Sequence, residues 1–364
     1  MAKLIKKYFL FFIAVIFLFE GMGLSAERKS LYRGARTRGM GGAFVGLSDD
    51  EQVLYQNPAG LAGYEKSEIH LLQGDVEFSS DILSSISDVR NAFSKFDSNT
   101  LNSILGENIY ARGTATSSLI IPNFGIGFIS DAQGAIYARN IALPQLIFGY
   151  QNTNGFITGF GFRLGKERRR PETPDIRFGV ATKVLWRRGG YFLLTPNQLL
   201  QLSEGKSFLS ETVGSYQLGF GLDLGSQYVQ RLSDRFTLSA GLSFKDIGDT
   251  SFTGPIAQPI ESDVTAGIGG KVELGLLDIN MVYDLSQLNR GGDYRVKSHL
   301  GLELDFPLIN LMFGLNQIYL TYGTEIDLGF FRLSALSYAE EIGTFAYQDS
   351  DRRYVIQFLF KFNL

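Results

Sequence analysis

The sequence predicts an all-β fold, a transmembrane antiparallel β-barrel of about 14 strands with an N-terminal plug, or hatch, inside the lumen. Three observations support this prediction: the last strand, the N-terminal segment and a recurring alternation of apolar residues. In the last strand, large apolar residues occupy every second position up to the final residue: Tyr354, Ile356, Phe358, Phe360, Phe362 and Leu364. Side chains on a strand alternate between its faces, so one face is continuously apolar. An outer-membrane barrel needs such a strand, because one face meets lipid and the other the lumen.

The N-terminus has the features of a secretory signal peptide. Three lysines among the first seven residues precede the apolar run 8–19, and a stretch of small residues ends at Ala26. The apolar run is too short for a transmembrane helix, and its flanks are those of a signal peptide. We therefore expect residues 1–26 to be a Sec signal peptide and the chain to reach the outer membrane of a Gram-negative cell, with membrane lipid around it.

Apolar residues alternate with glycine or charged residues throughout the chain, for example at 124–128, 218–224 and 300–306. This period fits either a soluble β-sandwich or a membrane barrel. The signal peptide and the last strand favour the barrel. The expected strands are 66–78, 115–130, 134–150, 155–165, 175–187, 211–225, 235–246, 261–275, 277–285, 295–306, 308–316, 318–328, 330–339 and 352–364.

An even number of strands places both termini on the periplasmic side, where connections are short. We expect periplasmic turns at Asp131–Gln133, near Leu276, at Pro307 and at Gly329. The longer connections then fall on the extracellular side. Two links, 166–174 and 226–234, are longer than is usual for a periplasmic turn.

Composition excludes several classes of function. The chain has no cysteine, so it has no disulfide and no thiolate metal site. Its net charge is −3 and its only dense basic run is Arg168–Arg170, so no nucleic-acid partner is expected. The only histidines are His70 and His299, which excludes a His-rich metal site, and we expect no cofactor. His299 adjoins Ser298, but strand neighbours face opposite sides, and no G-x-S-x-G motif is present. We expect no enzyme.

Residues 27–65 lack the pattern of a barrel strand. They contain a glycine-dense stretch, with Gly39, Gly41 and Gly42, and a turn-rich stretch with Asn57, Pro58 and Ala59. Glycine permits positive φ and close backbone approach, and Asn-Pro initiates a turn. Such a segment either hangs free or folds into the lumen, where surrounding protein makes irregular backbone tolerable at membrane depth. Residues 66–364 are then the barrel.

The motifs of this segment carry a family resemblance. Arg38–Gly46, the acidic pair Asp49-Asp50 and Asn57–Gly60 resemble the N-terminal hatch of FadL-type transporters of hydrophobic compounds, and still more closely the PorV/PorQ branch of that superfamily. Three late segments also resemble PorV-like proteins: Gly314–Gln317, Leu328–Phe331 and Ser337–Glu341. The resemblance implies a fourteen-stranded barrel with an N-terminal plug. FadL-type members pass long-chain fatty acids or other apolar molecules through a lateral opening, whereas PorV-like members serve protein secretion and surface attachment.

An apolar stripe in the first extracellular connection is the candidate landing site for an apolar ligand. From Ile82 it continues through Ile86, Val89, Phe93 and Phe96, with the three-and-four spacing of one helical face. The alternative is a helix that merely covers the barrel mouth. We hypothesise that the protein passes hydrophobic, fatty-acid-like molecules across the outer membrane. The alternative is a PorV-like scaffold that binds secretion-system or surface proteins and needs no continuous apolar path.

Overall fold

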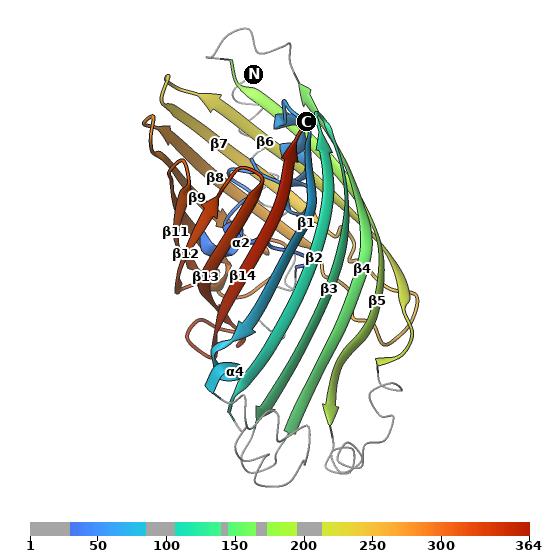
Figure 1. Ribbon diagram of the computed structural model, residues 1–364. Coiled ribbons are helices and arrows are strands. Elements are labelled where there is room, and N and C mark those ends of the chain that lie inside the picture. Colours follow the sequence, from blue (N-terminus) through green and yellow to red (C-terminus); the bar gives the residue numbers. More distant parts are fainter. Residues whose placement is uncertain (1–29, 85–105, 140–144, 165–172, 195–212) are drawn as a thin grey trace.

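The computed structural model describes residues 30–84, 106–139, 145–164, 173–194 and 213–364. Within these ranges, fourteen strands form a closed antiparallel β-barrel, as predicted, in which each strand pairs with its neighbours in the chain and β1 pairs with β14 (Figure 1). The strands are β1 (Glu68–Ser79), β2 (Asn108–Ile121), β3 (Phe124–Arg139), β4 (Gln145–Leu164), β5 (Asp175–Leu194), β6 (Gln217–Arg231), β7 (Phe236–Lys245), β8 (Asp263–Glu273), β9 (Asp278–Leu285), β10 (Ser298–Asp305), β11 (Ile309–Asn316), β12 (Tyr319–Asp327), β13 (Phe331–Glu341) and β14 (Ser350–Asn363).

The outer face of the barrel is apolar, as the alternation in the sequence predicts. In β14, Ile356 and Phe362 are about half exposed, whereas Val355 and Leu359, on the other face of the strand, are buried. The same alternation of exposed and buried residues occurs in β6 and β8. An apolar outer surface with this period is that of a barrel whose solvent is lipid. None of the described helices is long and apolar enough to cross a membrane.

The turn predicted at Asp131–Gln133 is wrong. These residues lie in the middle of β3, and the turn between β2 and β3 is Pro122-Asn123, where Asn123 has a φ of +68°. Proline supplies no N–H to a ladder, and asparagine tolerates the left-handed region, so this pair suits a tight turn. Asp131 resembled a turn residue because it is charged, but it faces the lumen and bonds Arg112 Nε at 2.6 Å.

The two ends of the barrel differ. The short turns at 122–123, 232–235, 274–277, 306–308 and 328–330 lie at the end that holds the C-terminus, which is therefore the periplasmic end. β6 continues to Arg231, which shortens the link expected at 226–234. At the other end, β2 to β5 extend beyond the rest of the wall, and the short helix α4 (Ser80–Ser84) follows β1 (Figure 1).

Residues 30–64, here called the N-terminal segment, lie inside the barrel and are mostly buried. They form two short helices, α2 (Ala35–Gly39) and α3 (Val53–Gln56), and the 3₁₀ helix η1 (Pro58–Gly63). Helix α2 contacts β11, β12, β13 and β14, and η1 contacts β3, β4, β5 and β6. The segment therefore reaches from one side of the lumen wall to the other. A further short helix, α9 (Tyr294–Lys297), precedes β10.

Candidate functional site

The three glycines predicted for the hatch lie where the N-terminal segment comes closest to β10 and β11. Gly41 has a φ of +67°, and a Cβ atom there would lie 2.4 Å from the Leu300 carbonyl oxygen. Gly42 has a φ of +82°, and its Cβ would lie 2.8 Å from His299 Nδ1. A Cβ on Gly39 would lie 2.8 Å from Met312 Sδ. A larger residue at Gly41 requires the segment to move off the wall, because the atoms that its Cβ would meet belong to the backbone of β10 and β11.

A buried carboxylate of the wall binds the next part of the segment. Asp284, near the extracellular end of β9, accepts hydrogen bonds from the backbone N–H groups of Phe44 and Val45 at 2.7 Å, and from that of Gly46 at 3.0 Å. Its side chain is fully buried. Hydrogen bonds to an ionised acceptor are roughly twice as strong as neutral ones. This carboxylate therefore fixes the position of the 44–46 backbone.

Ion pairs hold the start of the segment against β1, β13 and β14. Arg38 donates to Glu77 Oε2 at 2.7 Å and to Asp75 Oδ2 at 2.9 Å, both on β1. Arg33 pairs with Glu340 on β13, which also accepts from Arg353 of β14 at 3.4 Å. All of these side chains are buried. Removing one partner from such a network leaves an uncompensated buried charge. Breaking these ion pairs one at a time is therefore unfavourable.

Nearer the periplasmic end, Arg36 connects the segment to β10. Its guanidinium donates to Glu303 Oε2 at 2.7 Å, to Asp49 Oδ1 at 2.6 Å and to Asp50 Oδ2 at 2.9 Å. Burial, followed by the adjacent Glu51 carboxylate, raises the pKa of Asp50 to about 7, although Arg36 opposes the shift. Asp50 therefore changes charge near neutral pH.

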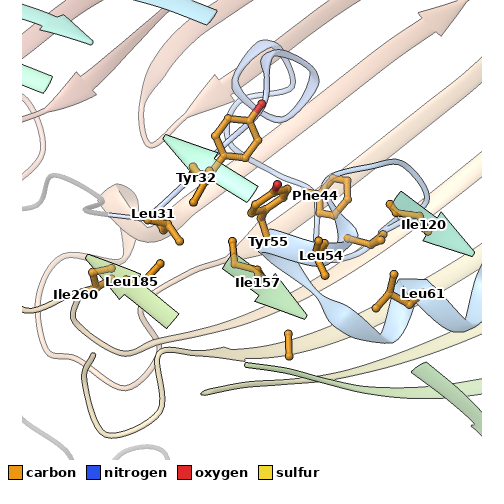
Figure 2. Close-up of a cluster of buried hydrophobic side chains, with 13 residues drawn as sticks. Leu31, Tyr32, Phe44, Leu54, Tyr55, Leu61, Ile120, Ile157, Leu185 and Ile260 are labelled. Atoms are coloured by element: carbon orange, nitrogen blue, oxygen red, sulfur yellow. The ribbon is translucent and has the colours of Figure 1, made fainter. Parts of the chain in front are cut away.

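On the opposite side of the lumen, apolar side chains lie among polar ones such as Asp131 and Lys183. Five wall residues point inward and are fully buried: Ile120, Ile129, Ile157, Ala181 and Leu185, from β2 to β5. They pack against Leu54 and Leu61 of the N-terminal segment, with Phe44 and Tyr55 in the same cluster (Figure 2). Barrel lumens are usually polar, so an apolar inner stripe is a distinctive feature. We call these five wall residues the inner apolar stripe.

Glycines in the same wall make room for the segment's leucines. A Cβ on Gly127 of β3 would lie 2.9 Å from Leu54 Cδ2, and a Cβ on Gly159 of β4 would lie 2.7 Å from Leu61 Cδ1. The residues predicted for the turn-rich part of the hatch begin η1 here. Asn57 Oδ1 accepts from Ala59 N at 3.3 Å, and Pro58 is at the first helical position, where its missing N–H has no cost.

A cavity of about 680 Å³ opens at the periplasmic end, beside the turns at 274–277, 306–308 and 328–330. Seven carboxylates and four cations line it: Asp49, Asp50, Asp278, Glu303, Asp305, Glu325, Asp327, Arg36, Lys271, Arg332 and Lys361. Two other cavities, beside Ser30 and Leu31, hold about 20 and 40 Å³. The large cavity is therefore strongly polar and lies on the side of the lumen away from the inner apolar stripe.

One side-chain group resembles a hydrolytic triad. Ser286 Oγ lies 2.9 Å from His299 Nε2, and His299 Nδ1 lies 3.0 Å from Asn316 Oδ1. A nucleophile needs room for its substrate, but Ser286 is only 2% exposed and lines none of the three cavities described. His299 Nδ1 also lies 2.9 Å from the Gly41 carbonyl oxygen. The group therefore connects the N-terminal segment to the wall.

Several predicted positions are outside the part of the chain that the structure describes. The candidate vestibule residues Ile86, Val89, Phe93 and Phe96 are among them, and so is Arg168–Arg170. Ile82, at the start of that stripe, lies in α4.

Comparison with known proteins identifies the fold. No protein-family model and no curated protein matches the chain. Among solved structures, a mutant of the TodX monoaromatic hydrocarbon channel lacking S2 and S3 has a TM-score of 0.51 and 14% identity, over 91% of this chain and 98% of that one. The TodX mutant lacking S2 has a TM-score of 0.51 and 15% identity, over 94% and 100%. The chain has the fold of the TodX monoaromatic hydrocarbon channel. At these identities, the likeness is one of fold.

Proposed function

We propose that the protein passes small apolar molecules, such as long-chain fatty acids or hydrocarbons, across the outer membrane, and that the N-terminal segment is the plug of this path. The observation that carries the proposal is the inner apolar stripe, which the segment covers through Leu54 and Leu61. The fold shared with the TodX channel supports the same assignment. On the proposed path, cargo moves along the β2–β5 wall as the plug shifts away from it.

The two sides of the plug differ in how much of their contact with the wall is apolar, and this difference suggests how the path opens. On the β9 and β1 side, directional hydrogen bonds and ion pairs to Asp284, Asp75 and Glu77 fix its position. On the β2–β5 side, Arg112 and Arg163 donate to the carbonyl oxygens of Leu31 and Ala62 at 2.7 and 2.6 Å. At the inner apolar stripe itself, the side-chain contacts of Leu54 and Leu61 are apolar. Such contacts are non-directional and roughly proportional to buried area. Exposing Leu54 or Leu61 to water costs about 1.5–3 kcal/mol each. An apolar ligand that covers the same surface offsets this cost, so apolar cargo opens a path that water does not.

Uptake into proteoliposomes tests this function. With the parent protein, a fluorescent long-chain fatty acid or toluene should enter faster than into protein-free vesicles. Ile157→Asn places an amide on the inner apolar stripe and should lower uptake at least tenfold, since about 1.4 kcal/mol is a factor of ten. Thr158→Asn, on the outward face of the same strand, is the matched control. Equal uptake with and without the parent protein would contradict the proposal.

A second function, a PorV-like scaffold for protein secretion or surface attachment, is favoured by a different observation. The cavity of about 680 Å³ is lined mainly by charged residues, and the ion pair of Arg36 with Glu303 holds the segment beside it. A scaffold needs no apolar path and predicts no uptake in the vesicle assay. It predicts instead that exported proteins of the same cell copurify with the barrel after cross-linking.

A further inference from the structure

Polar rows interrupt the apolar outer surface of β3 to β6 toward the extracellular end. The strand register places Phe128, Phe156, Val184 and Phe220 in one row across the four strands. The next row outward holds Ser130, Asn154, Trp186 and Leu218. One row further, Asn152 pairs with Arg188, and Tyr216 directly precedes β6. The apolar surface is therefore interrupted between Phe156 and Asn154, and Phe148 and Phe192 form a second apolar row further out. A polar interruption of this kind suits the level of the lipid headgroups.

The polar residues of these rows hold one another in place. Asn154 Nδ2 donates to Asn152 Oδ1 at 2.9 Å and to the Tyr216 hydroxyl at 3.3 Å. The Tyr216 ring lies 4.7 Å below the Arg188 guanidinium carbon. Trp186 packs edge-on against Phe156, with ring centroids 6.2 Å apart. These residues form an ordered platform of two amides, two aromatic rings and one guanidinium, here called the Arg188 patch: Asn152, Asn154, Trp186, Arg188 and Tyr216.

Among the residues that the structure describes, the charge of Arg188 has no counterpart. Within the described residues, its guanidinium has neither a hydrogen-bond acceptor nor a carboxylate within ion-pair distance, and its Nε is shielded from solvent without a partner. Its neighbour Arg187 faces the lumen and donates to Thr153 Oγ1 at 2.8 Å and to the Gln258 carbonyl oxygen at 2.9 Å. A shielded guanidinium N–H without an acceptor is costly, and a phosphate oxygen is an acceptor that suits it.

We propose that the Arg188 patch binds the phosphorylated headgroup of a glycolipid in the outer leaflet of the membrane. The phosphate meets the guanidinium of Arg188, and the amides and Tyr216 lie where sugar hydroxyls would sit. The row of Phe156 and Phe220, exposed by 48% and 65%, continues directly from the patch into the lipid belt and receives the acyl chains. This continuity favours a lipid over free phosphate. The site is on the outer wall and does not depend on transport through the lumen.

Trp186 is the only tryptophan of the chain, so its fluorescence reports on the patch directly. The full-length mature protein in detergent micelles is titrated with a bis-phosphorylated glucosamine lipid, with the same lipid after removal of both phosphates, and with inorganic phosphate. The phosphorylated lipid should shift or quench the emission saturably. Arg188→Gln should weaken its apparent affinity at least tenfold, whereas Arg188→Lys, which keeps the charge, should lose less.

Arg235→Gln removes the same charge from an exposed turn at the periplasmic end and should leave the affinity unchanged. Heat-modifiable mobility in electrophoresis checks that each variant is folded. An unchanged affinity in Arg188→Gln overturns the proposal, and so does equal loss in both glutamine variants. Equal binding of the dephosphorylated lipid also overturns it. If inorganic phosphate saturates the fluorescence change at the same concentration as the lipid does, the patch is an anion site and not a lipid site. That result also overturns the proposal.

Discussion

Replacing Asp284 with asparagine should release the plug locally without unfolding the barrel. The carboxylate accepts three backbone N–H bonds, from Phe44, Val45 and Gly46. An asparagine oxygen can retain two of them as neutral hydrogen bonds, each weaker by about 1 kcal/mol. The third N–H then lacks an acceptor, which costs about 1–3 kcal/mol. Asp284→Asn should therefore weaken docking of this stretch by about 3–5 kcal/mol, or at least 100-fold.

The absence of native cysteine allows a direct assay. Ala43 is 1% exposed, so a thiol introduced by Ala43→Cys should react with a maleimide only when the plug opens. We expect labelling to be at least 100-fold faster when Asp284→Asn is added, and nearly unchanged when Asp234→Asn, on an exposed turn, is added instead. Labelling at the same rate in all three proteins would refute the reasoning that Asp284 holds the plug.

Three further predictions follow from the same geometry. Gly41→Val should raise the leakage of small solutes measured as planar-bilayer conductance, because the new side chain meets the Leu300 carbonyl, whereas Gly113→Val meets nothing within 4 Å and should not. The pKa of Asp50 is raised from 3.8 to about 7, so the docked plug holds a proton that the released plug loses. Docking should then weaken as pH rises from about 4 to 7, and Asp50→Asn should flatten this dependence of conductance on pH. Replacing Phe93 and Phe96 with serine should lower fatty-acid uptake at least tenfold, and unchanged uptake would remove that stripe from the path.

The strand count could be predicted from the sequence because lipid imposes a strict period on the outer face. Residues such as Ile356 and Phe360 face lipid and must be apolar whatever the lumen contains. Their alternation can therefore be recognised in the sequence. The lumen imposes no such rule. A charged residue that faces the lumen from within a strand looks like a turn residue in the sequence, and for this reason the turn predicted at Asp131 is wrong.

The attachment of the plug could not be predicted in detail. Asp284 is about 240 positions from the backbone it binds, and nothing local in β9 distinguishes it from any other lumen-facing acid. The inner apolar stripe did leave a signal. Strand β4 has apolar residues on both of its faces: Phe156 and Phe160 on one and Ile157 on the other. A strand between lipid and a polar lumen would instead alternate apolar with polar residues. The glycines of the segment were recognisable because positive φ limits the choice of residue, as at Gly41.

Fixing the plug to the inner apolar stripe tests the proposed path most directly. A Cβ on Gly125 would lie 3.0 Å from Leu61 Cδ2, so the pair Gly125→Cys and Leu61→Cys has room once the leucine side chain is gone. No other thiol is present to compete. After a short bifunctional thiol reagent or oxidation joins the two residues, as mass spectrometry verifies, uptake of the fluorescent fatty acid should fall at least tenfold and return on reduction. Full uptake through the cross-linked protein would show that apolar molecules do not pass along the β2–β5 wall.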